Sequence, residues 1–249
     1  MEEQVFGVDR CNLELEQQLS AVSQIALLEG FISEVSGQAI LRAIRGQGRF
    51  HARASAETDP SFKQLIPYVV LTNEAGDKFF VYSRDRQQAE TRLHGRLSLG
   101  IGGHVEPRDL VAVEGKKQAA ISAAAARELR EEVLPDLGGK DLAGLVRIGF
   151  LNDDSNVVGS VHLGVAYVLV IPEESQAKLE NQQPPRVTGY WQSLDWVRQH
   201  SSRFETWSQL LIAEFSRVQQ WLEREPGEEE VSLDNFLSRM LSNTPFPAT

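Results

Sequence analysis

Two kinds of hydrophobic spacing alternate along the chain and together predict an α/β protein. Residues 68–72 and 78–82 are rich in β-formers and flank a turn at 73–77, where Gly76 can take a positive φ, so this segment predicts a hairpin. Strands, then a helix, then strands, then a helix favour an α/β/α sandwich around a mixed β-sheet. The remaining predicted strands are 97–101, 145–152, 161–170 and a short edge strand at 189–191.

Helical spacing predicts the rest of the architecture. The alanine-rich run at 118–126 is predicted to be helical, because alanine has the highest helix propensity of the amino acids. Residues 204–221 carry an apolar stripe of the kind that packs into a core. We expect three parts: an N-terminal helical extension (1–49) with its helix at 13–35, a central domain (50–222), and a charged linker with a short helix (223–249). Shorter helices are predicted at 193–200 and 232–241, and residues 46–61 are expected to be irregular.

Composition is that of an ordinary soluble enzyme. The chain has 249 residues, 41% of them hydrophobic and 24% charged, which is enough to bury a sizeable core. It has no apolar run near the roughly 18 residues of a membrane span, and its start lacks the pattern of a signal peptide. Cys11 is the only cysteine, so a reducing cytoplasm is the expected location. A net charge of −10 argues against broad nucleic-acid binding.

The chemistry is concentrated at 127–132, which reads Arg-Glu-Leu-Arg-Glu-Glu. On a helix, Glu128 shares a face with Glu131 and Glu132. Like charges so placed repel by roughly 0.2–0.5 kcal/mol per pair, and a hard divalent cation would reverse that sign. The simpler alternative is a solvated acidic face.

A glycine-rich loop lies upstream of these carboxylates, at 99–106, where Gly102 and Gly103 let the backbone approach a ligand closely. A Gly-Gly loop followed by a helix that ends Arg-Glu-Leu-X-Glu-Glu resembles the signature motif of the Nudix hydrolases. The residues that match the family pattern are Gly103, Arg127, Glu128, Leu129, Glu131 and Glu132.

The chain departs from that pattern in its spacing. The gap between Gly103 and Arg127 is ten residues longer than in the family. The first glutamate of the motif, which pairs with the motif arginine in the family, is replaced by Ala119 when counted backward and by Asp109 when counted forward. Candidate partners for the arginine are therefore Asp109, Glu106 and Glu114. A Leu134-Pro135 pair also follows where the family has a glycine at position 134.

The resemblance implies a metal-dependent pyrophosphohydrolase or phosphoesterase. Family members hydrolyse a nucleoside diphosphate linked to another group, and the expected cofactor is Mg²⁺ or Mn²⁺. The implied metal ligands are Glu128, Glu131, Glu132 and the backbone carbonyl at Gly102. These three glutamates are also the catalytic candidates, and the identity of the general base stays open. Arg127 is expected to tie the loop to the helix or, alternatively, to act in catalysis.

Weaker candidates surround this motif. We expect Gly103, His104, Arg53 and Asp153 to contact the substrate; the alternatives are that His104 anchors the loop and that Arg53 lies in a solvated loop. Residues 152–154, Asn-Asp-Asp, follow a strand and are typical of a turn. His162 lies within a predicted strand and is expected to pack in the core or wall. The glycine loop is expected at the N-terminal side of the helix, and the long insert 106–117 to border the substrate.

A closer resemblance is to a bacterial subgroup of predicted MutT-like phosphoesterases, and it covers about residues 50–222. It implies a small phosphorylated, nucleotide-derived substrate and leaves a homodimer open. Two other functions are alternatives: a non-catalytic nucleotide-sensing module, and a reaction like that of isopentenyl-diphosphate isomerase, which would need Cys11. The resemblance rests on the segments 63–68, 102–104, 152–154 and 159–164.

Overall fold

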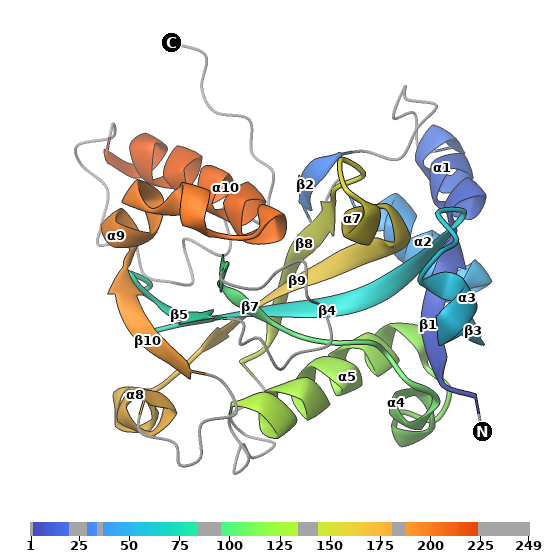
Figure 1. Ribbon diagram of the computed structural model, residues 1–249, viewed down its shortest axis with the longest axis horizontal. Coiled ribbons are helices and arrows are strands. Elements are labelled where there is room, and N and C mark those ends of the chain that lie inside the picture. The colour runs from blue at the N-terminus through green and yellow to red at the C-terminus, as the bar shows by residue number, and fades with distance from the viewer. Residues whose placement is uncertain are drawn as a thin grey trace. The chain divides into compact units, whose positions relative to one another are not determined.

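The computed structural model describes residues 2–19, 29–33, 37–83, 96–133, 144–180 and 188–223. The chain divides into two compact units, and Figure 1 draws and labels the helices and strands. The first comprises Met1–Tyr68, Gly102–Glu128 and Gly149–Ala166, and the second comprises Val69–Ile101, Leu129–Ile148 and Tyr167–Thr249. Three strands and one helix run from one unit into the other: β4 (Phe62–Thr72), β8 (Val146–Asn152), β9 (His162–Val170) and α5 (Lys117–Glu132).

Among the described residues, no helix combines the length and the apolar character that crossing a membrane requires.

The remaining strands are β1 (Gln4–Asp9), β2 (Gly30–Ser33), β3 (Arg49–Ala52), β5 (Lys78–Ser83), β6 (Leu97–Ser98), β7 (Gly100–Ile101) and β10 (Thr188–Ser193). The remaining helices are α1 (Arg10–Leu19), α2 (Gln38–Gln47), α3 (Arg53–Ala56), α4 (Pro107–Ala112), α7 (Val157–Val161), α8 (Glu173–Glu180), α9 (Leu194–Gln199), the 3-10 turn η2 (Ser201–Arg203) and α10 (Thr206–Glu223).

The first unit is organised around β1. This strand pairs antiparallel with β3, from Gln4↔Ala52 to Gly7↔Arg49, and then with β4. Its inward face contributes Val5 to a cluster with Ala56 and Phe62. In α2, apolar residues at helical spacing are fully or almost fully buried, and the helix packs against α1 and β1. The first unit thus buries the apolar faces of β1 and α2 together.

The second unit contains the predicted hairpin. Strand β5 pairs with β4 at Thr72↔Phe79 and with β10 along its whole length. In the turn, the side-chain oxygen of Asn73 accepts hydrogen bonds from the N–H groups of Asp77 and Lys78, and Gly76 has a φ of 70°. The chemistry that predicted the turn therefore forms it.

Hydrogen bonding orders six of the strands as β10-β5-β4-β9-β8-β2, and the predicted α/β class with a mixed sheet is confirmed. The N-terminal segment differs from the prediction of a helix at 13–35. The helix begins earlier, at Arg10, and residues 30–33 form strand β2, which pairs with β8 from Gly30↔Asn152 to Ser33↔Gly149. Pairing with another strand outweighed local helical spacing there.

The structure also differs from the predicted elements at several shorter segments. Residues 46–61 contain β3 and α3 rather than irregular chain, and the insert contains helix α4. The predicted strand at 97–101 is split into β6 and β7. The predicted helix at 232–241 lies outside the described residues, and the boundaries 1–49, 50–222 and 223–249 stay a prediction.

Candidate functional site

The two glycines of the loop have different structural tasks. A Cβ added to Gly102 would lie 1.7 Å from the carbonyl oxygen of Pro67 in β4, so only glycine permits this approach of two backbones. A Cβ added to Gly103 would lie 2.5 Å from Oε1 of Glu128. The missing side chain at Gly103 thus leaves room for the Glu128 carboxylate. Loop and helix, which are 25 positions apart, meet at this point.

Arg127 ties the loop to the helix, as the sequence predicted. Its Nε and Nη2 donate to the two carboxylate oxygens of Asp109, each at 3.0 Å, and Nη2 also donates to the carbonyl of His104 at 2.8 Å. Nη1 donates to Oε1 of Glu128 at 2.6 Å. Burial alone would lower the pKa of Arg127, but the hydrogen bonds to Asp109 and the charge of Glu128 raise it above its ordinary value.

Asp109 is the principal partner of the arginine, so the forward count from Gly103 identifies the right position. Its side chain is only 4% exposed, and it also accepts a hydrogen bond from the backbone N–H of Glu106 at 2.8 Å. Glu106 approaches Arg127 only to 3.8 Å, and Glu114 is exposed with a φ of 53°. The displaced acid is therefore supplied from α4, inside the insert.

The three glutamates lie in the last turns of α5, and each is half-buried. Glu131 and Glu132 lie one turn beyond Glu128 on the same continuous helix, so the predicted stripe follows from helix geometry. The loop, however, contacts Glu128 and Arg127 near the C-terminal end of α5. The expectation that it lies at the N-terminal side of the helix was wrong, because the insert returns the chain to the start of α5 at a distance from the loop.

His104 belongs to a second cluster of side chains. Its Nε2 lies 3.4 Å from Nε2 of His162 and 3.7 Å from Oε1 of Glu57. Burial, followed by the nearby charge of Arg53, lowers the pKa of His104 to about 3. His104 is therefore a neutral ring at physiological pH.

Two of the predicted substrate contacts are occupied within the protein. Arg53 donates to Glu3 at 2.5 Å and to Glu57 at 3.4 Å, so its charge is already compensated. Asp153 accepts hydrogen bonds from the backbone N–H of Ser155 at 3.0 Å and from Asn156 at 2.7 Å. Asp153 thus forms the turn that its sequence context predicted, and its predicted contact with substrate stays a prediction.

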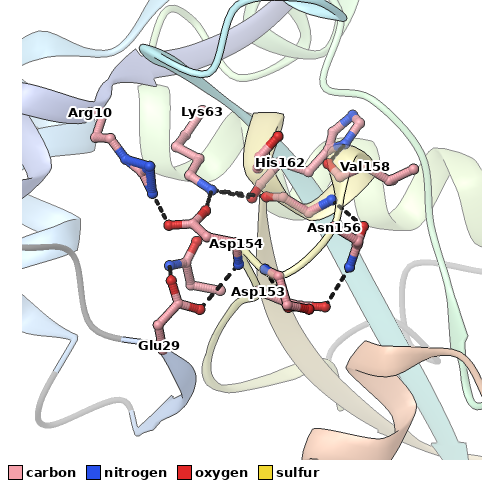
Figure 2. A network of polar contacts seen from close by, with 12 residues as sticks. Arg10, Glu29, Lys63, Asp153, Asp154, Asn156, Val158 and His162 are labelled. Atoms are coloured by element: carbon pink, nitrogen blue, oxygen red, sulfur yellow. Dashed lines mark hydrogen bonds and ion pairs between the residues drawn. The ribbon is translucent and has the colours of Figure 1, made fainter.

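Sequence reasoning missed a buried polar network next to this turn (Figure 2). The side chain of Lys63 is 0% exposed, and its Nζ donates to Asp154 at 2.5 Å and to the carbonyls of Gly159 and His162 at 2.8 and 3.3 Å. Arg10 also pairs with Asp154. Burial, followed by the charge of Arg10, lowers the pKa of Lys63 to about 7. The signal available was a lysine beside a glutamine, just ahead of the apolar run at 68–72.

Two sets of residues could hold a cation. The glutamates of α5 offer only oxygen donors, which suit Mg²⁺ or Mn²⁺. Among the residues that the structure describes, Glu57, His104 and His162 also bring one ligand atom each within 4.8 Å of the others. His162 is only 7% exposed and was expected merely to pack.

Known proteins resemble this chain in sequence and in structure. It is 36% identical over 189 residues to protein YmaB of Bacillus subtilis (strain 168). The aligned region covers 74% of this chain and 86% of that protein. It matches the crystal structure of Tm1382, described as a candidate Nudix hydrolase, with a TM-score of 0.61 and 25% identity over 87% of this chain and 99% of that one. A Nudix hydrolase from Alicyclobacillus acidocaldarius is more distant, with a TM-score of 0.43 and 14% identity over 56% of this chain and 83% of that one. No model of a known protein family matches the chain.

Proposed function

Because this chain belongs to the Nudix hydrolase superfamily and is a relative of protein YmaB, we propose that it hydrolyses a pyrophosphate bond in a nucleoside diphosphate linked to a second group. It is a hydrolase of that superfamily. The observation that carries the proposal is the contact between loop and helix. Gly103 leaves room for the carboxylate of Glu128, and Arg127 is bound to both Asp109 and the loop carbonyl at His104.

In this proposal the divalent cation is held by Glu128, Glu131 and Glu132, with the carbonyl of Gly102 as a further oxygen donor. Hard divalent cations prefer such donors, and carboxylates one turn apart on a helix repel each other unless a cation lies between them. The fit is supported by the space beside Gly103, where the three atoms nearest to an added Cβ all belong to the Glu128 carboxylate. When bound, the cation neutralises phosphate charge and lowers the pKa of a water ligand.

Arg127 acts in this proposal as a positioning residue. Its guanidinium already faces two carboxylates, those of Asp109 and Glu128, so little positive charge remains for a phosphate. Its bonds hold Glu128 and the loop carbonyl in a constant relationship. This arrangement supports a preorganised site, in which ligands do not have to be ordered when substrate binds.

The contacts with substrate are assigned with the same reasoning. Gly103 and His104 lie in the loop that meets Glu128, so they are the candidates best supported by position. Arg53 and Asp153 would first have to release Glu3 and the turn at 153–156. We therefore propose Gly103 and His104 as the residues closest to the phosphates, with Arg53 and Asp153 acting through their neighbours.

A panel of phosphate anhydrides tests the function. Nucleoside triphosphates, nucleotide sugars, ADP-ribose and dinucleoside polyphosphates would each be incubated with the full chain and Mg²⁺ or Mn²⁺, and the phosphorylated products identified. We expect at least one class to be cleaved between two phosphorus atoms, with activity lost in chelator. Turnover that survives complete chelation would contradict the metal assignment. Tight nucleotide binding without any turnover would favour the sensing module instead.

A further inference from the structure

A second cation site lies outside the glutamates of α5. We propose that Glu57, His104 and His162 form a binding site for a borderline divalent transition metal, with Zn²⁺ as its representative. The three residues come from the end of α3, the glycine loop and the start of β9, all within the first unit. Its donors differ from those of the oxygen site, and His104 is the one residue that it shares with the proposed substrate contacts.

The two histidines are spaced as two ligands of one zinc ion would be. Zn²⁺ in proteins lies about 2.0–2.1 Å from histidine nitrogens, so two such nitrogens on a tetrahedral ion are about 3.3–3.4 Å apart. The Nε2 atoms of His104 and His162 are 3.4 Å apart. Oε1 of Glu57 lies 3.7 Å from Nε2 of His104, a few tenths of an ångström beyond the same geometry. The Glu57 side chain is 36% exposed, and all three ligand atoms lie within 4.8 Å of one another.

A hydrogen bond at Nδ1 of His162 leaves its Nε2 able to bind a metal. Its Nδ1 lies 2.7 Å from the carbonyl oxygen of Val158, which can only accept a hydrogen bond. In the neutral ring, Nδ1 therefore carries the proton and Nε2 presents a lone pair toward His104. A backbone carbonyl bound to the outer nitrogen is the usual way in which proteins orient a metal-binding histidine.

Hydrogen bonds hold two of the three ligands in place. Lys63 donates to the backbone carbonyl of His162 at 3.3 Å and to that of Gly159 at 2.8 Å, so two hydrogen bonds hold the segment that carries this histidine (Figure 2). Arg53 donates to Glu57 and holds its carboxylate. Three protein ligands leave a fourth position for water or substrate, which is the arrangement of catalytic rather than structural zinc sites.

His104 and His162 can also contact each other without a metal, with Nε2–H of His104 donating to Nε2 of His162. A measurement of metal binding separates this direct hydrogen bond from a cation site. Imidazole nitrogens favour Zn²⁺ over Mg²⁺, whereas the glutamates of α5 favour Mg²⁺. Zinc binding measured in excess Mg²⁺ therefore reports the histidine site separately.

The experiment uses the full chain without a histidine tag, stripped of metal and then kept in millimolar Mg²⁺. Zn²⁺ is titrated in competition with a chromogenic chelator, and Co²⁺ is used in parallel for its visible absorption. We expect one equivalent of Zn²⁺ per chain, and at least a tenfold loss of affinity in His104→Gln and in His162→Gln. The control is His200→Gln, which replaces a histidine that stacks on Trp196 in α9. It should keep the parent affinity.

Glu57→Gln serves as the variant that preserves the fold, because this side chain is partly exposed. It should lower Zn²⁺ affinity and change the Co²⁺ spectrum, with an unchanged unfolding temperature. A parent chain that takes up no Zn²⁺ under these conditions would overturn the proposal. So would histidine variants that bind Zn²⁺ as the parent does.

Discussion

Arg127 binds Asp109 through two parallel hydrogen bonds of 3.0 Å, and the pair is almost entirely buried. These hydrogen bonds tie the insert, which is ten residues longer than the family spacing, to helix α5. Because both oxygens of the carboxylate are used, the geometry depends on the planar guanidinium, which a lysine cannot reproduce.

The first prediction concerns this pair. Asp109→Asn preserves shape but removes one of the two carboxylates that compensate the buried guanidinium of Arg127, the other being Glu128. We expect the free energy of unfolding to fall by about 3 kcal/mol, as for other buried pairs that lose one partner. Denaturant unfolding measures it. Asp195→Asn is the matched control, since this carboxylate is 77% exposed and pairs with Arg198 at 3.4 Å, and its cost should stay below about 1 kcal/mol. Equal losses in both variants would contradict the structural role of Asp109.

The second prediction concerns the stripe on α5. Glu131→Gln and Glu132→Gln each remove a proposed metal ligand with little change of shape. Activity with Mg²⁺ should fall by about two orders of magnitude or more, since a ligand and its charge are lost together. Unfolding temperature should change little. The control is Glu174→Gln, an exposed carboxylate at the start of α8. A glutamate whose variant turns over substrate at the parent rate is not a metal ligand that matters.

The third prediction concerns Gly103. In Gly103→Ala the new Cβ would meet the end of the flexible Glu128 side chain, which can move aside. We expect the fold to survive while activity and Mg²⁺ affinity fall at least tenfold. Gly46→Ala is the control, because a Cβ at this exposed position in α2 meets nothing within 4 Å. It should stabilise the chain slightly, by about 0.5–1 kcal/mol. An active Gly103→Ala enzyme would show that the position of Glu128 is not critical.

The fourth prediction concerns the insert. Helix α4 exposes Val111, which is 79% accessible, while Asp109 in the same helix anchors Arg127. Replacing residues 111–116 by a Gly-Ser linker removes the exposed part and keeps the anchor. We expect KM or substrate preference to shift across the anhydride panel, with Mg²⁺ affinity retained, because loops on a rigid scaffold often carry specificity. An unchanged substrate profile would leave the insert with the anchor as its only role.

The fifth prediction concerns Lys63. Lys63→Met fills a similar volume but leaves Asp154 and two backbone carbonyls without their donor. We expect a loss of about 2–4 kcal/mol in the free energy of unfolding, somewhat less than for a fully buried pair because Asp154 keeps Arg10. Lys78→Met, at the exposed start of β5, should change stability by no more than about 0.5 kcal/mol. Similar unfolding midpoints for both variants would show that the network contributes little.

Local features were determined by the sequence itself. The hairpin of β4 and β5, the alanine-rich helix α5 and the glutamate stripe all depend on neighbours within a few positions, so periodicity and turn chemistry predict them. Asp109 was among the predicted partners of Arg127 because spacing alone limits the choice. The turn at Asp153 was predicted for the same reason.

Only the tertiary structure decided which distant residues meet. Arg127 and Asp109 are 18 positions apart, His104 and His162 are 58, and Lys63 and Asp154 are 91. The strand β2, where a helix was expected, exists because it pairs with β8. Such contacts depend on the path of the whole chain. Periodicity within a segment shows which face is apolar, but it holds no information about which distant side chain that face will meet.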